Sequence, residues 1–188
     1  DYVKLKSVDG SIYYFAKDNL EYQRLEKQFS EKKYWIKGVP KLKTISQIFK
    51  EHGGYEEIGS VKGSELVGLE YIGPFDDLDA QNKPGGFPFI NDELEEDGIT
   101  SVMQHRVIDP GKDKIGNDIV ISGEGTGIVH MAPGCGDIDH KVGKEKGLIN
   151  IAPLDEEAKF MGGFGWLEKK SATDPDTIDQ IIQDLKDR

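Results

Sequence analysis

The segment GTGIVHMAPGCGDIDH, residues 125–140, combines glycines and a proline with a thiol, two histidines and two aspartates. Such a mixture is not typical of a plain core strand. We expect residues 127–132 to form a buried strand that leads through a glycine bend into a helix, with Asp137 as the N-cap and Gly147 as the stop signal. A helix N-terminus directs backbone N–H groups outward and favours a bound anion or carbonyl oxygen. The segment therefore predicts a binding site.

Several chemistries are compatible with this segment. A phosphate cradle would use the glycines, but the G-x-G-x-x-G fingerprint and a Lys-Ser/Thr pair after the glycines are absent. Cys135 is a possible nucleophile, because a thiol that is flanked by glycines just before a helix start can have a lowered pKa. A metal site would draw on mixed ligands without C-x-x-C or H-E-x-x-H spacing: His130, Cys135, Asp137, Asp139 and His140. The purely structural alternative makes His130 a strand histidine and Asp139 a first-turn acid that complements the helix dipole.

The chain before this segment is expected to be rich in strands. Residues 2–16 alternate around Asp9-Gly10, which predicts a β-hairpin. EIGSVKG (57–63) and LEYIGPF (69–75) are interpreted as short strands, and QNKPGGFPF (81–89) as an irregular loop. Residues 101–122 are interpreted as two strands joined by a polar excursion at residues 109–118.

Three further helices are predicted. The first, at residues 18–29, has Asp18 or Asn19 as its N-cap and an apolar pattern of Leu20, Leu25 and Phe29. The second lies in KLKTISQIFKEHGG, residues 41–54, and is closed by its two final glycines, Gly53 and Gly54. The C-terminal helix has Asp174 as its cap, Pro175 at its first position and an apolar stripe of Ile178, Ile181, Ile182 and Leu185.

Composition limits the class of protein. With 188 residues, 36% of them hydrophobic and 31% charged, the chain suits a single folded domain. The sequence contains no apolar run of the roughly 20 residues that a membrane span needs and no signal-peptide pattern at the start, so we expect a cytoplasmic protein without a membrane partner. One cysteine is ordinary in a reducing compartment.

The net charge of −11 argues against a broad nucleic-acid-binding face, because phosphate binding depends on dense lysine and arginine. Residues 31–50 break this trend, since they carry six lysines against one glutamate, with Tyr34 and Trp35 between them. Aromatic rings beside lysines can clamp the end of a nucleic-acid strand. The alternative is a solvated helix face with Trp35 in the core.

The run from Gly125 to His130, followed by Ala132-Pro133, Gly136 and Asp139, resembles the motif G-T-G-x-V-H-x-A-P-x-x-G-x-x-D of the editing (connective polypeptide) domain of isoleucyl-tRNA synthetases, which are class I aminoacyl-tRNA synthetases. The resemblance covers most of the chain. The valyl and leucyl enzymes share the G-T-G opening and an aspartate, and their equivalent domain is an alternative. The fold implied is α+β, centred on a β-barrel and decorated with short helices.

The resemblance implies hydrolysis of the ester of valine wrongly attached to isoleucine tRNA. Asp139 and His130 would be the catalytic residues: Asp139 would hold the α-ammonium of the amino acid, and His130 would line the side-chain pocket. Gly125, Thr126 and Gly127 would contact the terminal adenosine. The implied partners are the 3′ end of mischarged tRNA and the catalytic core of a parent enzyme. The domain itself would need no metal or other cofactor, whereas the parent would use ATP, Mg and in some cases Zn.

The chain also departs from the family pattern. Cys135, Ile138 and His140 stand where the family more often has other residue types, so the shape around Asp139 is expected to differ. The family's threonine-rich strand and the signatures of its adenylating core are absent. We therefore expect residues 1–188 to be one editing domain, a monomeric fragment of a larger synthetase whose own hydrolysis is weak or lost. A tRNA 3′-end binding module without chemistry is the alternative function.

Overall fold

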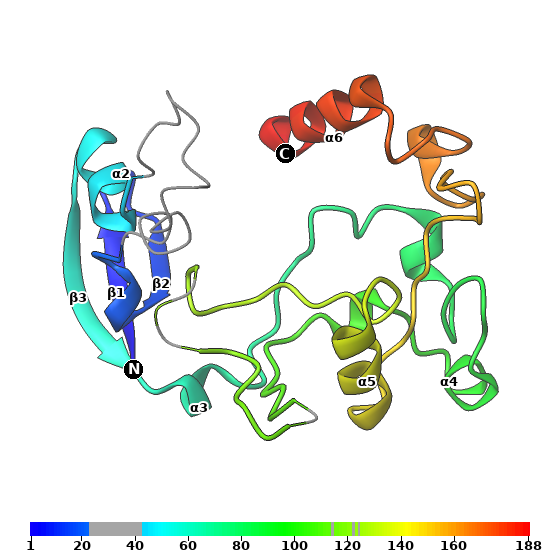
Figure 1. Cartoon of the computed structure of the whole chain (residues 1–188), viewed down its shortest axis with the longest axis horizontal. Coiled ribbons are helices and arrows are strands. Elements are labelled where there is room, and N and C mark those ends of the chain that lie inside the picture. The colour runs from blue at the N-terminus through cyan, green and yellow to red at the C-terminus, as the bar shows by residue number, and fades with distance from the viewer. Residues whose placement is uncertain (23–42, 114, 122, 124) are drawn as a thin grey trace, which may run out of the picture. The chain divides into compact units, whose positions relative to one another are not determined.

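The computed structural model describes residues 1–22, 43–113, 115–121, 123 and 125–188 (Figure 1). Contacts within the chain cluster into two compact units. The first unit comprises Asp1–Val67 and Ile108–His130, and the second comprises Gly68–Val107 and Met131–Arg188. The division falls inside the segment 125–140, between His130 and Met131. The expectation of a single domain over the whole chain stays a prediction.

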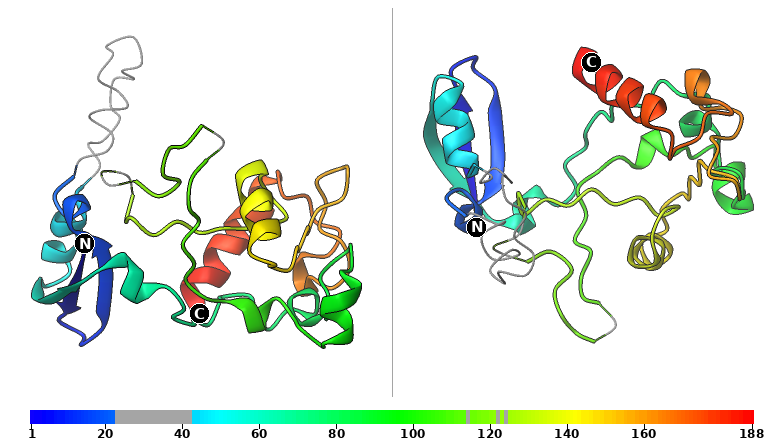
Figure 2. Two further views of the ribbon diagram at one scale, coloured as in Figure 1. Left: turned by 90° about the horizontal axis from the view of Figure 1, so that it is seen from below. Right: turned by 45° about the horizontal axis from the view of Figure 1, so that its top comes forward.

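A three-stranded antiparallel sheet forms the first unit's framework. β1 (Tyr2–Ser7) pairs with β2 (Ile12–Ala16) on one side and with β3 (Tyr55–Val61) on the other, which gives the order β2-β1-β3 (Figures 1 and 2). Val3 and Leu5 alternate along β1 and are almost fully buried, as expected for the inner face of a central strand. The predicted hairpin is confirmed. Of the strand predicted at residues 57–63, residues 57–61 are confirmed as part of β3, and Gly63 begins a helix instead.

One α-helix packs on this sheet through an aromatic cluster. α2 (Ile45–Glu51) begins after Thr44, whose hydroxyl accepts the backbone N–H of Gln47 while the Gln47 side chain accepts the N–H of Thr44. The Phe49 ring lies edge-on to three rings of the sheet, at centroid distances of 5.1, 5.8 and 5.7 Å: Tyr13, Phe15 and Tyr55. The predicted second helix is confirmed.

The helix expected at residues 18–29 is only partly covered by the structure. Its first two residues lie in the 3₁₀ turn η1 (Lys17–Asn19), and residues 20–22 are described but form no helix. Residues 23–29, with Leu25 and Phe29, lie outside the described residues. The lysine-rich segment 31–50 is described only from residue 43 onward, where it contributes α2. The first unit also contains the short helix α3 (Gly63–Leu66).

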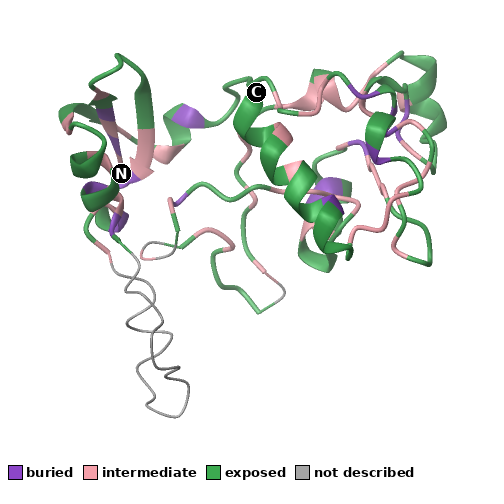
Figure 3. Cartoon of the chain, turned by 90° about the horizontal axis from the view of Figure 1, so that it is seen from above, coloured by how far each residue is buried: buried purple, intermediate pink, exposed green. Residues whose placement is uncertain are grey.

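The second unit is built from short helices around a small apolar core (Figure 3). The core contains four buried residues, Leu78, Ala80, Phe164 and Leu167. Ala80 of η3 and Leu167 of η5 belong to this core, and Ile181 of α6 packs against it. The helical elements of the unit are η3 (Asp79–Asn82), α4 (Asp92–Glu96), η4 (Val102–Gln104), α5 (Asp137–Glu145), η5 (Gly165–Leu167) and α6 (Pro175–Asp187). α5 and α6 confirm the two helices predicted in this part of the sequence. Gly136 is the N-cap of α5, so the prediction of Asp137 as its cap was wrong.

Four of the predicted strands are wrong. The described residues of 69–75 and 101–122 contribute only isolated bridges, Glu70 with Arg106 and Lys112 with Asp118, and residues 102–104 form η4 instead. Residues 127–132 form no strand, and they are not buried as a group, because Ile128 and Val129 are 45% and 57% exposed. Gly73 and Pro74 interrupt the first of these runs, and Pro110, Gly111 and Gly116 interrupt the second, which shortens the stretches available for a ladder. Residues 127–132 are not interrupted, but they pair with no described strand.

The fold class is α+β, as predicted. Within the described ranges the sheet is open, and no closed barrel is seen there. None of the helices described combines the length with the apolar character that crossing a bilayer requires.

Candidate functional site

The Gly-Thr-Gly run, residues 125–127, forms a corner that is bound to the N-terminal part of the first unit. Its three successive carbonyl oxygens all accept hydrogen bonds. The donors, in chain order of the acceptors, are Asn19 Nδ2 (3.0 Å), Ala16 N (2.8 Å) and Tyr2 Oη (2.6 Å). The hairpin and the turn after it therefore fix the direction of this backbone.

Gly127 has to be a glycine in this corner. Its φ of +78° lies in the left-handed region, and an added Cβ would lie 2.3 Å from the Cβ of Ala16. Gly125 also has a positive φ, of 54°. The Thr126 hydroxyl donates to the Ile128 carbonyl at 2.9 Å and accepts the Ile128 N–H at 3.2 Å, so it is occupied locally.

Asp139 lies in the first turn of α5 in the second unit. It is half-buried, and its Oδ2 accepts the backbone N–H of Ala132 at 3.0 Å. No hydrogen bond from the described residues reaches its Oδ1. Asp137, two residues earlier in the same turn, is exposed. The sequence thus places one carboxylate between the helix start and the preceding loop, and a second, nearby carboxylate in solvent.

The loop that carries this contact, residues 132–136, is seated closely on neighbouring backbone. A Cβ on Gly134 would lie 1.9 Å from the carbonyl oxygen of Ile151, and a Cβ on Gly143 of α5 would lie 2.7 Å from the Cβ of Pro133. Cys135 N–H closes the loop by donating to the Ala132 carbonyl at 2.9 Å. The glycines therefore allow the loop and the helix to approach their supports.

The predicted site residues fall into two groups. Gly125, Thr126, Gly127 and His130 belong to the first unit, and Asp139 belongs to the second. The contacts described above hold residues 125–127 and Asp139 in place within their own units. The side chain of His130 is exposed to solvent. The structure therefore brings the Gly-Thr-Gly residues together as one corner and describes the Asp139 turn separately.

The alternative of a cysteine nucleophile is not supported. Desolvation of the Cys135 thiol, together with the nearby Asp139 carboxylate, raises its pKa, although the residue as a whole is exposed. A reactive thiol needs the opposite shift. In the part of the chain that the structure covers, no group of three or more histidine, cysteine or acidic side chains is arranged to hold a metal ion.

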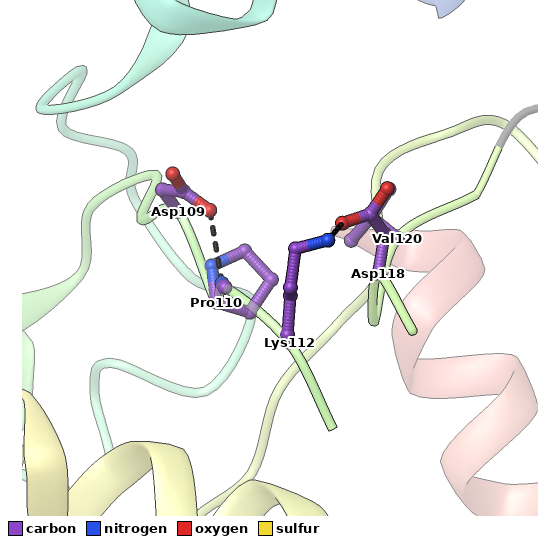
Figure 4. A pocket seen from close by; sticks show the side chains of 6 residues that line it. Asp109, Pro110, Lys112, Asp118 and Val120 are labelled. Carbon is purple, nitrogen blue, oxygen red and sulfur yellow. Dashed lines mark hydrogen bonds and ion pairs between the residues drawn. The ribbon is translucent and has the colours of Figure 1, made fainter. Parts of the chain in front are cut away.

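A shallow pocket of about 230 Å³ lies elsewhere in the first unit, where the polar excursion folds back on itself (Figure 4). Lys112 Nζ lies 3.3 Å from Asp118 Oδ1 across it, and Asp109 Oδ1 accepts the Gly111 N–H at 2.9 Å. None of the predicted site residues lines this pocket.

Two features of the site were missed from the sequence. Local sequence patterns predict Asn19 only as a helix cap and Tyr2 only as a strand residue. In the structure both side chains donate hydrogen bonds to the corner at residues 125–127. Their partners lie more than 100 positions away in the sequence, so no local pattern indicates the contacts.

No family model matches the chain. Curated relatives do match: the isoleucine-tRNA ligase of Methanocaldococcus jannaschii is 33% identical over 172 residues, which is 89% of this chain and 14% of that protein. The isoleucine-tRNA ligase of Methanothermobacter marburgensis is 35% identical over 133 residues (71% of this chain, 10% of that protein). That of Rickettsia peacockii is 32% identical over 147 residues (77% and 11%).

These similarities define a class of protein, the ligases that join amino acids to tRNA. Within this class, the chain belongs to the isoleucine-tRNA ligase family. The chain spans only 10% to 14% of the length of these relatives, so the match is to a segment of each.

Proposed function

We propose that this chain is an editing domain that hydrolyses the ester between valine and isoleucine tRNA during protein synthesis. The observation that carries the proposal is the Asp139 carboxylate, which the Ala132 N–H holds at the start of α5 within the editing-type motif. Sequence similarity to a segment of isoleucine-tRNA ligases supports the same assignment. A closed barrel around the open sheet belongs to the proposal as well.

The need for such an activity follows from binding energies. A synthetic pocket discriminates against a side chain that is one methylene smaller by only about 1–3 kcal/mol. Valine is therefore attached to isoleucine tRNA at an appreciable rate, and a second, size-limited site has to remove it. An ester hydrolase that admits valine and excludes isoleucine fulfils this role.

Asp139 is the anchor for the α-ammonium group of the misattached amino acid. One carboxylate oxygen is held by Ala132, and Oδ1 is left to accept from the ammonium. A charge-assisted hydrogen bond of this kind is about twice as strong as a neutral one. It would fix the ester carbonyl relative to the water that attacks it.

The remaining predicted residues complete the substrate contacts. His130, which is exposed, lines the side-chain pocket and excludes isoleucine. The backbone at residues 125–127 approaches the terminal adenosine of the tRNA, for which glycines leave room. The partners are the mischarged tRNA 3′ end and the catalytic core of a parent ligase, in the cytoplasm. ATP, Mg and Zn belong to that core, and this domain uses none of them.

A binding module that positions the tRNA 3′ end without chemistry is the second candidate. It is favoured by the Thr126 hydroxyl, which is occupied by Ile128, and by the exposure of His130, because neither arrangement is that of an enclosed reaction site. The two candidates differ in turnover, since a module binds the aminoacylated end and releases it unchanged.

The test compares Asp139→Asn with Asp137→Asn in deacylation of valyl-tRNA specific for isoleucine. Both variants remove one negative charge from the same turn, but only the first removes the anchor. We expect Asp139→Asn to lower kcat/KM about tenfold to a hundredfold, as for loss of a hydrogen bond to a charged group, and Asp137→Asn to change it about twofold at most. Equal effects of the two variants would reject Asp139 as the anchor of the ammonium group. No turnover by the parent chain or by either variant, with binding of the aminoacylated end retained, would favour the binding module over the hydrolase.

A further inference from the structure

Asn19 is one of the few polar residues buried in the first unit, with 1% of its surface exposed. Its side-chain amide forms hydrogen bonds with two points of one distant segment. Nδ2 donates to the Gly125 carbonyl at 3.0 Å, and Oδ1 accepts the Gly123 N–H at 2.7 Å. The amide therefore holds the backbone just before the Gly-Thr-Gly corner by two hydrogen bonds, and this pair of bonds is called the clip below.

The clip works together with two other donors. Ala16 N–H binds the Thr126 carbonyl at 2.8 Å, and the Tyr2 hydroxyl binds the Gly127 carbonyl at 2.6 Å. Because the carbonyls of residues 125–127 point toward Asn19, Ala16 and Tyr2, the peptide planes between these carbonyls have fixed directions. Glycines at positive φ have little intrinsic preference for this geometry, so side chains have to impose it.

We infer that Asn19 is a positioning residue for the backbone that receives the terminal adenosine of the aminoacylated tRNA. The inference rests on the proposed editing or binding site. Asn19 does not contact the substrate: it acts through Gly123 and Gly125, whose peptide groups it orients. Loss of the clip therefore weakens binding of the acceptor end more than it slows the chemical step.

Two substitutions separate the clip from simple burial. Asn19→Asp has the same shape and keeps an acceptor for the Gly123 N–H, but it places an oxygen against the Gly125 carbonyl, where a donor is needed. Asn19→Ala removes both bonds. Tyr2→Phe removes only the hydroxyl bound to Gly127, and it tests the same corner without touching Asn19.

Asn82→Ala is the matched control. The exposed Asn82 amide also forms two hydrogen bonds with the backbone, by donating to the carbonyls of Asp76 (2.6 Å) and Leu78 (3.1 Å). It belongs to the second unit, which contains none of the residues proposed to contact the adenosine. A variant that merely reduces the amount of folded protein lowers the apparent kcat and leaves KM unchanged, which makes KM the informative quantity.

The experiment measures KM and kcat for deacylation of valyl-tRNA by the full chain, and binding of an amide-linked valyl-adenosine that cannot be hydrolysed. Amide hydrogen exchange at Gly123 reports the clip directly. We expect Asn19→Asp and Asn19→Ala to raise KM and the Kd of the analogue about tenfold, with kcat within about twofold of the parent chain. Tyr2→Phe should raise KM less, and Asn82→Ala should leave it unchanged.

An unchanged KM and Kd in Asn19→Asp, or in an Asn19→Ala protein that has lost protection at Gly123, would overturn the inference while the proposed function stands. If the parent chain neither hydrolyses valyl-tRNA nor binds the analogue, the proposed function itself fails, and the positioning role falls with it.

Discussion

Gly127 and Gly134 show how single residues of the segment 125–140 act. The high density of glycines in this segment indicated from the sequence that its backbone has to adopt geometry that other residues do not allow. The structure shows that Gly127 and Gly134 permit close packing, because Gly127 approaches Ala16 and Gly134 approaches Ile151. The side-chain partners of the corner could not be predicted, because Asn19 reaches it from a position 106 residues away. Periodicity and capping rules relate residues that are close in the sequence, so they do not predict a contact between residues more than 100 positions apart.

The first residue-scale prediction concerns Gly127→Ala. The added methyl would meet Ala16 at 2.3 Å and would also hold an L-residue at a φ of +78°. We expect a loss of about 2–4 kcal/mol in the free energy of unfolding, from the sum of overpacking and left-handed strain. Urea denaturation measures this loss.

Gly147→Ala is the control for that measurement. Gly147 also has a positive φ, of 63°, but an added Cβ would have no atom within 4 Å. Only the conformational strain remains, so the expected loss is about 1 kcal/mol. Similar losses at the two positions would contradict the close approach of residue 127 to the hairpin.

At the scale of elements, helices and the hairpin were predictable because their signals are local. The Thr44 cap with Gln47, the Pro175 start of α6 and the Asp9-Gly10 turn are each complete within a few residues. The wrong strands at residues 69–75, 101–122 and 127–132 depended on distant pairing partners. Alternation indicates a strand only where another strand is available to pair with it. The structure provides single bridges at residues 69–75 and 101–122, and no bridge among the described residues involves residues 127–132.

α6 supplies a prediction at this scale. Its C-cap residue, Arg188, binds the Asp77 carboxylate at 2.7 Å and stacks over the Phe75 ring at 5.0 Å, within the second unit. The hydrogen bond from Arg188 lowers the pKa of Asp77, and the same pairing raises the pKa of Arg188. Asp77 therefore stabilises the docked helix above its ordinary pKa of 3.8, and this contribution is lost as the pH falls through the lowered value.

Hydrogen-exchange protection factors of α6, measured between neutral pH and pH 3, test this contact. We expect Asp77→Asn to reduce protection at neutral pH and to remove most of the decrease seen on acidification. Asp179→Asn, which makes the same charge change on an exposed part of α6, should behave like the parent chain. A decrease at low pH that persists in Asp77→Asn would show that other groups control the docking.

At the scale of the whole molecule, the net charge of −11 remains the strongest constraint on partners. With 35 acidic residues against 24 basic ones, the chain is poorly suited to bind tRNA phosphates over a broad face, so the proposed recognition of tRNA depends on the acceptor end. The proposed site is consistent with this, because it uses one carboxylate for an ammonium group and a fixed backbone corner for an adenosine. The relatives are far longer than this chain, which matches 14% of the length of the Methanocaldococcus jannaschii enzyme.

The most direct test of the central claim is a cycle that varies both Asp139 and the ammonium group it is proposed to hold. Binding is measured for amide-linked valyl-adenosine and for its 3-methylbutanoyl counterpart, which lacks only the α-amino group, with the parent chain and with Asp139→Asn. We predict that removing the amino group weakens binding to the parent chain about tenfold to a hundredfold and changes binding to Asp139→Asn about twofold at most. The same loss in both proteins would mean that Asp139 does not hold the ammonium group, and the account of this site would be wrong.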